Sequence, residues 1–552
     1  MAEESKTEAS NFIFEIIKQD IADKVNGGNI QTRFPPEPNG YLHIGHTKAL
    51  CLSFGAAEKF SGKCNLRFDD TNPEKEETEF VQAIKDDITW LGFEWAKECY
   101  ASNYFEQLYS WALQLIKKGL AYVDDLTAEE MAEYRGTVTN PGKNSPHRDR
   151  SMQENLDLFQ QMREGKFPDG SKTLRAKIDM ASPNMHFRDP VMYRIKRQHH
   201  HRTGDRWCIY PSYDYAHGQS DSLEEVTHSL CSHEFETHRP LYAWFIEQLE
   251  IFPSRQIEFA RLNLTYTELS KRKLRRLIEE GVVSGWDDPR MPTLRAMRRR
   301  GVPPQAIKNF VNRVGVTKYI GWTDIALLEH EMRNVLNQKA TRRMVVFDPL
   351  KVVITNIPEG DTKTLKIPNN PEDPEDGDRE VIFGRTVYIE RADFLEDAPR
   401  KFFRLKPEGE VRLRGSYVIK CEEIIKDEAG QITELRCAAD LETLGQNPQG
   451  RKVKGVIHWV HDDSSVPITV NLYDLLFKEE KPTDDKDLLE QLSENSLQTV
   501  EAVAEGALAE ATVEKYYQFE RIGYFVMDLQ SKAEKKVFNR TVALKDRWNK
   551  KF

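Results

Sequence analysis

The spacing of hydrophobic residues over the first 120 positions predicts alternating helices and strands. Residues 11 to about 25 carry apolar side chains at helical spacing, which predicts a short docking helix. The short apolar segments 30–34 and 64–68 predict strands, whereas the longer patterns over 42–57 and 104–118 predict helices. The amino-terminal part is therefore expected to mix strands and helices.

The pattern changes after Ala340, where short alternating segments are separated by loops. Such spacing predicts antiparallel barrels or sandwiches. The acidic stretch 478–494 is interpreted as a surface connection. Before this change, the segment 174–206 predicts short strands with many cations, and 208–214 predicts a further apolar strand.

The segment 32–46, T-R-F-P-P-E-P-N-G-Y-L-H-I-G-H, joins a strand to a helix. Its prolines exclude a helix, because proline lacks an N–H and pushes the preceding residue out of the α region. A turn at Asn39-Gly40 then places His43 and His46 in the first turn of the next helix. Unpaired N–H groups there suit a phosphate, and Gly45 would let a nucleotide approach the backbone.

The two histidines allow other interpretations. They could form a polar cap, or bind a metal, although two ligands do not close a zinc site. The seven cysteines include no C-x-x-C pair, which argues against a structural zinc and against a disulfide framework. We therefore expect reduced thiols and no protein-bound metal.

Two carboxylates, Asp69 and Asp70, follow the predicted strand 64–68. Open α/β sheets place ligand contacts at the carboxyl ends of their strands. The alternative is that Asp70 or Asn72 caps the helix predicted over 74–91.

The charge of the chain is unevenly distributed. The net charge is −10, but the segment 261–318 contains fourteen Lys and Arg against five Asp and Glu, a local charge of +9. Such a run is often only a solvated face. Segregation on this scale favours a polyanion partner that binds one basic face.

The composition describes a globular protein of several domains. The 552 residues suggest three or four domains, with 39% hydrophobic and 30% charged residues. No window approaches the roughly 18 apolar residues of a membrane span, and residues 1–10 contain no apolar signal core. We expect a cytoplasmic protein with no membrane partner.

Three motifs carry a resemblance to a known family. Residues 36–46, P-E-P-N-G-Y-L-H-I-G-H, are similar to the HIGH signature of class I aminoacyl-tRNA synthetases in its glutaminyl/glutamyl branch. The segment 269–273, L-S-K-R-K, resembles the K-M-S-K-S loop in its M-S-K-R variant, with Leu269 at the usual Met position. The run 286–293, W-D-D-P-R-M-P-T, also resembles this branch, and the likeness to glutaminyl-tRNA synthetases covers nearly the whole chain.

This resemblance implies a multidomain α/β plus all-β protein. Its catalytic domain would be a Rossmann-type fold split by an acceptor-stem insertion, followed by a helical subdomain and two β-barrels that read the anticodon. The expected segments are a docking helix at 1–28, the first catalytic half at 29–103, the insertion at 104–206, the second half at 207–262, the helical subdomain with the K-M-S-K-S-like loop at 263–339, and the barrels at 340–552.

The resemblance also implies a reaction. ATP would activate L-glutamine to an adenylate, and the glutaminyl group would then pass to tRNA(Gln), releasing AMP and diphosphate. Activation in this branch generally needs tRNA. Magnesium would arrive with ATP rather than in a protein cage. We expect a monomer.

The family pattern assigns roles to individual residues. His43, His46 and Lys271 would act in catalysis as donors to phosphate, the histidines in neutral or cationic form. Asp69 would pair the ammonium group of the amino acid and Tyr213 would meet its side chain, with Arg33 and Gln256 nearby. The alternatives for Tyr213 and Arg33 are a core tyrosine and a structural ion pair. Besides the three catalytic residues, the positions that match those lining ATP are Glu37, Pro38, Asn39, Ile44, Gly45, Ser232, Arg261, Leu262, Leu269 and Ser270. The candidate tRNA contacts are Arg290, Arg298, Arg299, Arg300, Thr317 and Lys318.

Other functions remain open at this point. A glutamyl-tRNA synthetase, whether discriminating or non-discriminating, shares the same motifs. A non-catalytic RNA-binding relative would not need His43, His46 and Lys271. A general nucleotidyltransferase would share only the histidine motif and would leave the C-terminal half without a role.

Overall fold

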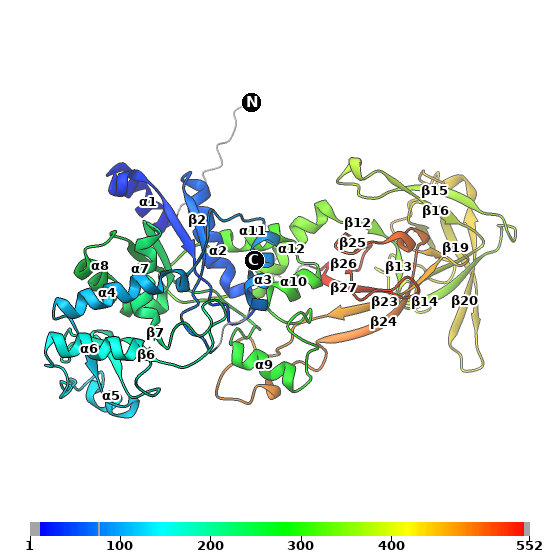
Figure 1. The fold of residues 1–552 in the computed structure, drawn as a ribbon. Coiled ribbons are helices and arrows are strands. Elements are labelled where there is room, and N and C mark those ends of the chain that lie inside the picture. The colour runs from blue at the N-terminus through cyan, green and yellow to red at the C-terminus, as the bar shows by residue number, and fades with distance from the viewer. Residues whose placement is uncertain (1–10, 75–77, 546–552) are drawn as a thin grey trace. The chain divides into compact units, whose positions relative to one another are not determined.

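A computed structural model describes residues 11–74 and 78–545 (Figure 1). The chain divides into two compact units. The first comprises Met1–Asn263 and Val311–Thr323, and the second comprises Leu264–Phe310 and Asp324–Phe552. Among the residues that the structure describes, no helix combines the length and the apolar character needed to cross a membrane.

A parallel sheet forms the centre of the first unit. Strands β1 (Gln31–Phe34), β2 (Lys63–Phe68) and β3 (Glu98–Tyr100) pair in parallel, and so do β8 (His228–Ser232) and β9 (Arg255–Phe259). The N–H of Thr227, just before β8, donates to the carbonyl of Gln31 in β1 at 2.9 Å. The two groups of strands therefore lie side by side in the order β3-β2-β1-β8-β9.

Helices alternate with the strands of the first unit. They are α1 (Phe12–Ala22), α2 (Thr47–Lys59), α3 (Thr78–Trp90), α4 (Phe105–Lys117), α7 (Tyr213–Leu223) and α8 (Arg239–Leu249). The predicted docking helix is present as α1, which buries Ile13 and Ile17 in one cluster with Leu230 and Ile257 of the sheet. The alternation of strand and helix expected from the sequence is confirmed.

A second, antiparallel sheet lies between the two parallel groups in the sequence. Its strands, in the order β4-β5-β6-β7, are β4 (Ala121–Asp124), β5 (Thr173–Ala176), β6 (Val191–Ile195) and β7 (Ile209–Pro211), accompanied by α5 (Ala128–Arg135) and α6 (Met152–Arg163). The apolar strand predicted over 208–214 is present only as β7. It pairs with β6 and belongs to this sheet rather than to the parallel one.

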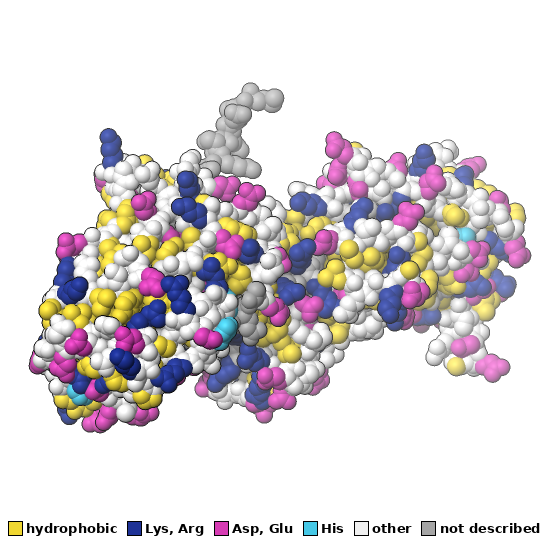
Figure 2. Space-filling view, in the orientation of Figure 1, with side chains coloured by type: hydrophobic (Ala, Val, Ile, Leu, Met, Phe, Trp, Pro, Cys, Tyr) yellow, Lys and Arg dark blue, Asp and Glu magenta, His cyan; other side chains and the backbone are white. Residues whose placement is uncertain are grey.

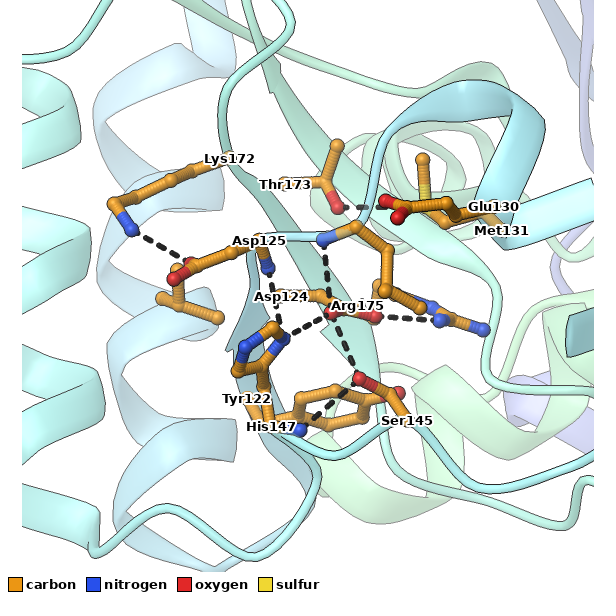
Figure 3. A network of polar contacts seen from close by, with 12 residues as sticks. Tyr122, Asp124, Asp125, Glu130, Met131, Ser145, His147, Lys172, Thr173 and Arg175 are labelled. Carbon is orange, nitrogen blue, oxygen red and sulfur yellow. Dashed lines mark hydrogen bonds and ion pairs between the residues drawn. The ribbon is translucent and has the colours of Figure 1, made fainter.

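Polar residues fix the long loop between α5 and α6 to this antiparallel sheet (Figure 3). The buried carboxylate of Asp124 accepts hydrogen bonds from Ser145 at 2.8 Å and from Arg175 at 2.6 Å, and it lies 3.0 Å from Nδ1 of His147. The cations of this loop serve the fold too, since Arg148 pairs with Asp189 and Arg150 pairs with Asp125.

The helices of the C-terminal half are α9 (Lys271–Glu279), α10 (Leu294–Arg300), α11 (Pro304–Val314) and α12 (Ile325–Lys339). The acidic stretch 478–494 is more than a surface connection, because it packs against α9. Lys273 lies 2.6 Å from Asp484, Arg276 lies 2.9 Å from Asp487, and Leu277 is buried with Leu488. Figure 2 shows Lys and Arg side chains over α9 with acidic side chains beside them.

Two seven-stranded sheets complete the second unit. The all-β character that the sequence pattern predicts is confirmed, although four pairs of neighbouring strands are parallel rather than antiparallel. One sheet has the order β12-β25-β26-β27-β23-β24-β13 and the other β21-β18-β19-β20-β14-β17-β22, with a separate β15–β16 hairpin. The strands are β12 (Thr341–Arg343), β13 (Val345–Val346), β14 (Pro349–Ile354), β15 (Lys363–Pro368), β16 (Asp378–Phe383), β17 (Thr386–Glu390), β18 (Glu410–Leu413), β19 (Val418–Lys426), β20 (Ile432–Asp440), β21 (Val456–Ile457), β22 (Val460–His461), β23 (Val466–Tyr473), β24 (Leu497–Ala504), β25 (Tyr516–Phe519), β26 (Gly523–Met527) and β27 (Lys536–Ala543). The first sheet combines strands from both ends of this region, because β12 pairs in parallel with the distant β25. The strands of the second sheet lie between them in the sequence.

Candidate active site

Backbone N–H groups hold the side chains of His43 and His46. Nδ1 of His43 accepts a hydrogen bond from the N–H of Gly45 at 3.1 Å, and Nδ1 of His46 accepts one from the N–H of His43 at 3.0 Å. The ring centroids are 3.9 Å apart. The predicted helix start at Leu42 is too early, because these bonds close a 3-10 turn, Ile44–His46, and α2 begins at Thr47.

The same bonds determine where the ring protons lie. Because each Nδ1 accepts a hydrogen bond, a neutral ring carries its proton on Nε2. Burial lowers the pKa of His43 well below its usual value, and the neighbouring His46 lowers it further. Burial also lowers the pKa of His46 to about 4. Both histidines are therefore neutral near pH 7. Of the neutral and cationic forms expected from the sequence, only the neutral form is favoured. Each Nε2–H can act as a donor.

Asp69 lies next to the proline-rich loop. Its N–H donates to the carbonyl oxygen of Pro36 at 3.0 Å, which ties this loop to the end of β2. The side chain is buried. Burial, and after it the negative charge of Glu37, raises the pKa of the Asp69 carboxyl to about 7. A bound cation would favour the ionised carboxylate at this position.

Asp70 has a structural role instead. Its carboxylate accepts hydrogen bonds from the N–H and the hydroxyl of Ser102 at 2.8 and 2.6 Å, so that it fixes the turn after β3. The prediction that Asp70 caps the helix after it is wrong. The other candidate, Asn72, accepts a hydrogen bond from the N–H of Glu74 at 3.4 Å, while residues 75–77 lie outside the described residues.

Tyr213 opens α7 and lies in an aromatic cluster. Its ring stacks on His217 with 5.0 Å between centroids and lies 5.2 Å from Phe235. The side chain is half-buried, unlike that of a core tyrosine. Burial raises the pKa of its phenol well above the usual value, and the nearby Cys231 and Asp69 act in the same direction. The protonated phenol can both donate and accept a hydrogen bond.

His217 is a site residue that the sequence reasoning missed. Its Nε2 lies 2.7 Å from Nη2 of Arg33, and because a guanidinium only donates, this Nε2 accepts. Burial lowers the pKa of His217 to about 3, so the ring is neutral. The available sequence signal was the spacing of Tyr213 and His217, four residues apart on one helix face.

A buried ionic cluster supports this helix face. Arg33 is completely buried, and its Nε donates to Asp221 at 3.0 Å while Nη1 donates to the carbonyl of Leu230 at 2.8 Å. Arg67 lies 2.7 Å from Asp221 and 3.3 Å from Glu224. The structural ion pair considered for Arg33 is therefore present. The cluster contains two cations and two carboxylates, without net charge.

The remaining predicted residues of the first unit are more dispersed. Gln256 donates to the carbonyl of Phe235 at 2.9 Å and thereby supports the ring that contacts Tyr213. Gln256 and Lys318 also line a cavity of about 430 Å³ beside α1 that does not include Asp69 or Tyr213.

Four predicted ATP-lining residues differ in exposure. Ser232 ends β8, and Arg261 is exposed and pairs with Glu234 at 2.6 Å, whereas Leu262 is buried. Glu37 is exposed and accepts a hydrogen bond from the amide of Asn39.

Comparison with known proteins identifies the family. A family model described as tRNA synthetases class I (E and Q), catalytic domain, matches residues 29–338. Two models described as class I (E and Q) anti-codon binding domains match residues 340–440 and 456–528. The chain belongs to the class I tRNA synthetases of the E and Q type.

Curated relatives share the full length of this synthetase. The glutamine--tRNA ligase of Pseudomonas aeruginosa (strain LESB58) is 56% identical over 555 residues, which covers 99% of this chain and 100% of that protein. The glutamine--tRNA ligase of Rhodopirellula baltica is 56% identical and covers 99% of this chain and 91% of that protein. A solved glutamate tRNA ligase from Elizabethkingia meningosepticum matches 56% of this chain and 70% of that chain at 17% identity, with a TM-score of 0.41, which is too distant to add to the argument.

The M-S-K-R-like loop of this synthetase lies in the second unit. Lys271 is the first residue of α9, and Ser270 occupies the N-cap. Glu268 organises the loop, because its Oε1 accepts from the N–H groups of Leu269 and Ser270 at 2.9 and 2.8 Å. Its other oxygen lies 2.7 Å from the ammonium group of Lys273.

The arginines around α10 of the synthetase are paired within the second unit. Arg299 donates to Asp528 at 3.0 Å, Arg300 donates to the carbonyl of Thr541 at 3.2 Å, and Arg290 donates to Asp288 at 2.8 Å. Only Arg298 among the four predicted here is strongly exposed, at 46%, although it too contacts Glu514. Arg299 and Arg300 therefore hold α10 against the C-terminal strands.

Proposed function

We propose that this synthetase attaches L-glutamine to tRNA(Gln) in an ATP-dependent reaction through a glutaminyl-adenylate, with release of AMP and diphosphate. The observation that carries the proposal is the 56% identity with glutamine--tRNA ligases over 99% of the chain, which includes both the catalytic and the anticodon-binding regions.

The histidine pair fits the first step. Attack of the amino acid carboxylate on the α-phosphate builds negative charge on phosphate oxygens, and the protein contributes mainly position and charge stabilisation. The Nε2–H groups of His43 and His46 supply neutral donors at the start of α2, and Lys271 supplies a cation. Mg²⁺ comes with the nucleotide and neutralises phosphate charge. The residues named from the family pattern around Glu37, Ser232 and Arg261 line the ATP.

The surroundings of Tyr213 favour glutamine over glutamate. Its supporting cluster of Arg33, Arg67, Asp221 and Glu224 has no net charge, and His217 is neutral because burial lowers its pKa to about 3. A substrate carboxylate would therefore lose water without gaining an unpaired cation, which is unfavourable. An amide can both donate to and accept from the phenol of Tyr213. Asp69 pairs the ammonium group.

The division of the chain follows the same proposal. Segments 1–28, 29–103, 104–206, 207–262, 263–339 and 340–552 are the docking helix, the first catalytic half, the acceptor-stem insertion, the second half, the helical subdomain and the anticodon-binding part. The exposed residues Arg298, Thr317 and Lys318 contact the tRNA backbone. The protein acts in the cytoplasm as a monomer.

Exchange of pyrophosphate into ATP tests whether the protein is an enzyme. We expect exchange that depends on both glutamine and tRNA(Gln). Absence of exchange, with tRNA binding retained, would instead identify a non-catalytic RNA-binding relative. Exchange that depends on glutamate alone would favour a glutamyl-tRNA synthetase.

A further inference from the structure

Two histidines and one aspartate from three separate elements meet beside the aromatic cluster of Tyr213. His186 lies in the 3-10 turn Met185–Phe187, Asp214 lies in the first turn of α7, and His238 ends the 3-10 helix His233–His238. One nitrogen from each ring and one carboxylate oxygen lie within 4.8 Å of one another. All three side chains are half-buried, so water can reach the group.

Neighbouring contacts within the chain hold the two histidines together. The side-chain amide of Asn184 donates to the carbonyl of Thr237 at 2.9 Å, and its oxygen accepts from the N–H of His186 at 3.0 Å. The rings of His186 and His238 lie 3.7 Å apart between centroids, and Nδ1 of His238 is 2.6 Å from Asp214. Contacts of the chain itself therefore organise this geometry.

A second group of two histidines and one aspartate has a structural role and differs from the group of His186, Asp214 and His238. In the group Asp70, His200 and His201, the carboxylate already accepts from Ser102, and Nδ1 of His200 accepts from the N–H groups of Arg202 and Thr203 at 3.2 Å. Its ligand atoms are committed to the fold. By contrast, within residues 11–74 and 78–545 the ring of His186 forms no hydrogen bond, only its contact with the ring of His238.

We infer that His186, Asp214 and His238 bind one divalent transition-metal ion of the zinc type. Two imidazoles and a carboxylate are ligands that zinc and its neighbours accept in proteins, and water can fill the fourth position of a tetrahedral site. Ligand atoms about 2.0–2.2 Å from zinc lie roughly 3.3 Å from one another. The three ligand atoms, which lie within 4.8 Å of one another, therefore need a change of no more than about 1.5 Å in their spacing.

The bound ion joins parts of the chain that are distant in sequence. His186 belongs to the region of the antiparallel sheet, whereas Asp214 and His238 belong to α7 and to the turn that follows β8. The ion stabilises the folded first unit, because it binds the native arrangement and the three ligands are scattered in the unfolded chain. This role is independent of the proposed aminoacylation and does not supply a metal for the reaction.

Metal binding by the untagged full-length protein tests the inference. After treatment with EDTA and its removal, competition with a chromogenic chelator should show one bound Zn²⁺ per chain, and the melting temperature of the first transition should rise with added Zn²⁺. Bound Co²⁺ should give the visible bands of a tetrahedral site without the near-ultraviolet band of thiolate ligation, which excludes the cysteines as ligands.

Variants then locate the ion. His186→Ala and His238→Ala should each weaken Zn²⁺ binding by at least about 100-fold, since loss of even an outer-shell partner costs about 10- to 100-fold. The matched control is His199→Ala. His199 lies 3.1 Å from Asp205 in an exposed pair with no third ligand in the described structure, and its loss should leave binding unchanged.

Three outcomes would overturn the inference. The first is that the wild-type protein binds no Zn²⁺ at concentrations on the order of 100 micromolar. The second is that both His186→Ala and His238→Ala still bind Zn²⁺ stoichiometrically. The third is a Co²⁺ spectrum with the band of thiolate ligation. The Co²⁺ spectrum of the wild-type protein needs no substitution, so the inference stays testable if a variant does not fold.

Discussion

The backbone N–H of His43 donates a hydrogen bond to Nδ1 of His46 across 3.0 Å. This bond separates two functions of one side chain, because Nδ1 shapes the turn and Nε2–H remains a donor. An asparagine can replace Nδ1 with its side-chain oxygen but does not reach the position of Nε2. His46→Asn should therefore keep the melting temperature while adenylate formation falls about 10²- to 10³-fold, the usual cost of one lost donor.

His46→Ala is the matched comparison for that prediction. It removes both functions, so it should lower adenylate formation to a similar extent and also lower the melting temperature. Equal melting temperatures for all three proteins with unchanged pyrophosphate exchange in His46→Asn would contradict the assigned donor role.

The ionisation of Asp69 should govern how glutamine is used at different pH values. Its pKa is raised to about 7 by burial and by the charge of Glu37, and only the carboxylate can pair an ammonium group. At saturating ATP, kcat/KM for glutamine should rise with pH through about 7 and then level off. Glu37→Gln removes the negative neighbour, lowers the pKa of Asp69 and should move this limb to lower pH. An unmoved limb would mean that another group titrates.

The buried cluster beneath Tyr213 should respond strongly to loss of one charge. Asp221→Asn leaves Arg33 and Arg67 short of a carboxylate, and breaking such a buried pair costs about 3–5 kcal/mol. Denaturant unfolding monitored by a probe in the first unit measures this loss. The control Asp205→Asn removes an exposed partner, 86% accessible, and should change the unfolding free energy by less than about 0.5 kcal/mol. Equal effects would mean that the cluster has no special role.

Lys271 should matter for chemistry and not for tRNA affinity. Lys271→Ala is expected to slow adenylate formation by about 10²-fold or more, because a charge that stabilises the reacting phosphates is lost. The neighbouring Arg272→Ala, also on α9, controls for the general positive charge of this helix. If both variants lose adenylate formation and tRNA binding to the same extent, the loop is structural.

Neighbouring arginines of α10 should separate RNA binding from stability. Arg298→Ala should weaken tRNA binding and reduce its salt dependence with little change in melting temperature, since Arg298 is 46% exposed. Arg299→Ala should instead lower the melting temperature, because Arg299 is 9% exposed and pairs with Asp528. Nitrocellulose filter binding at several salt concentrations and a thermal melt distinguish the two.

The sequence predicted much of the local structure because that information lies in neighbouring residues. The strands β1 and β2, the helix α4 and the turn before His43 follow from apolar spacing, prolines and glycines within a few positions. The sequence left open which strands pair with which. The pairing of β7 with β6, and of Thr341 with Tyr517 across the C-terminal sheet, depends on which of several similar strands packs best in three dimensions.

The candidate site shows the same division. The motifs brought out His43, His46, Asp69 and Tyr213, but the neutral state of the histidines follows from burial and from hydrogen bonds that no motif records. The role of His217 was hidden for a related reason, since its partner Arg33 lies 184 positions away.

Aminoacylation of purified tRNA(Gln) with glutamine and with glutamate in parallel tests the central claim most directly. The cluster beneath Tyr213 is neutral, and the phenol of Tyr213 can hydrogen-bond to an amide. We therefore predict that kcat/KM for glutamine exceeds that for glutamate, by about 10⁴-fold if the site is built around the amide hydrogen bonds. Faster charging with glutamate, or equal rates for the two amino acids, would contradict it.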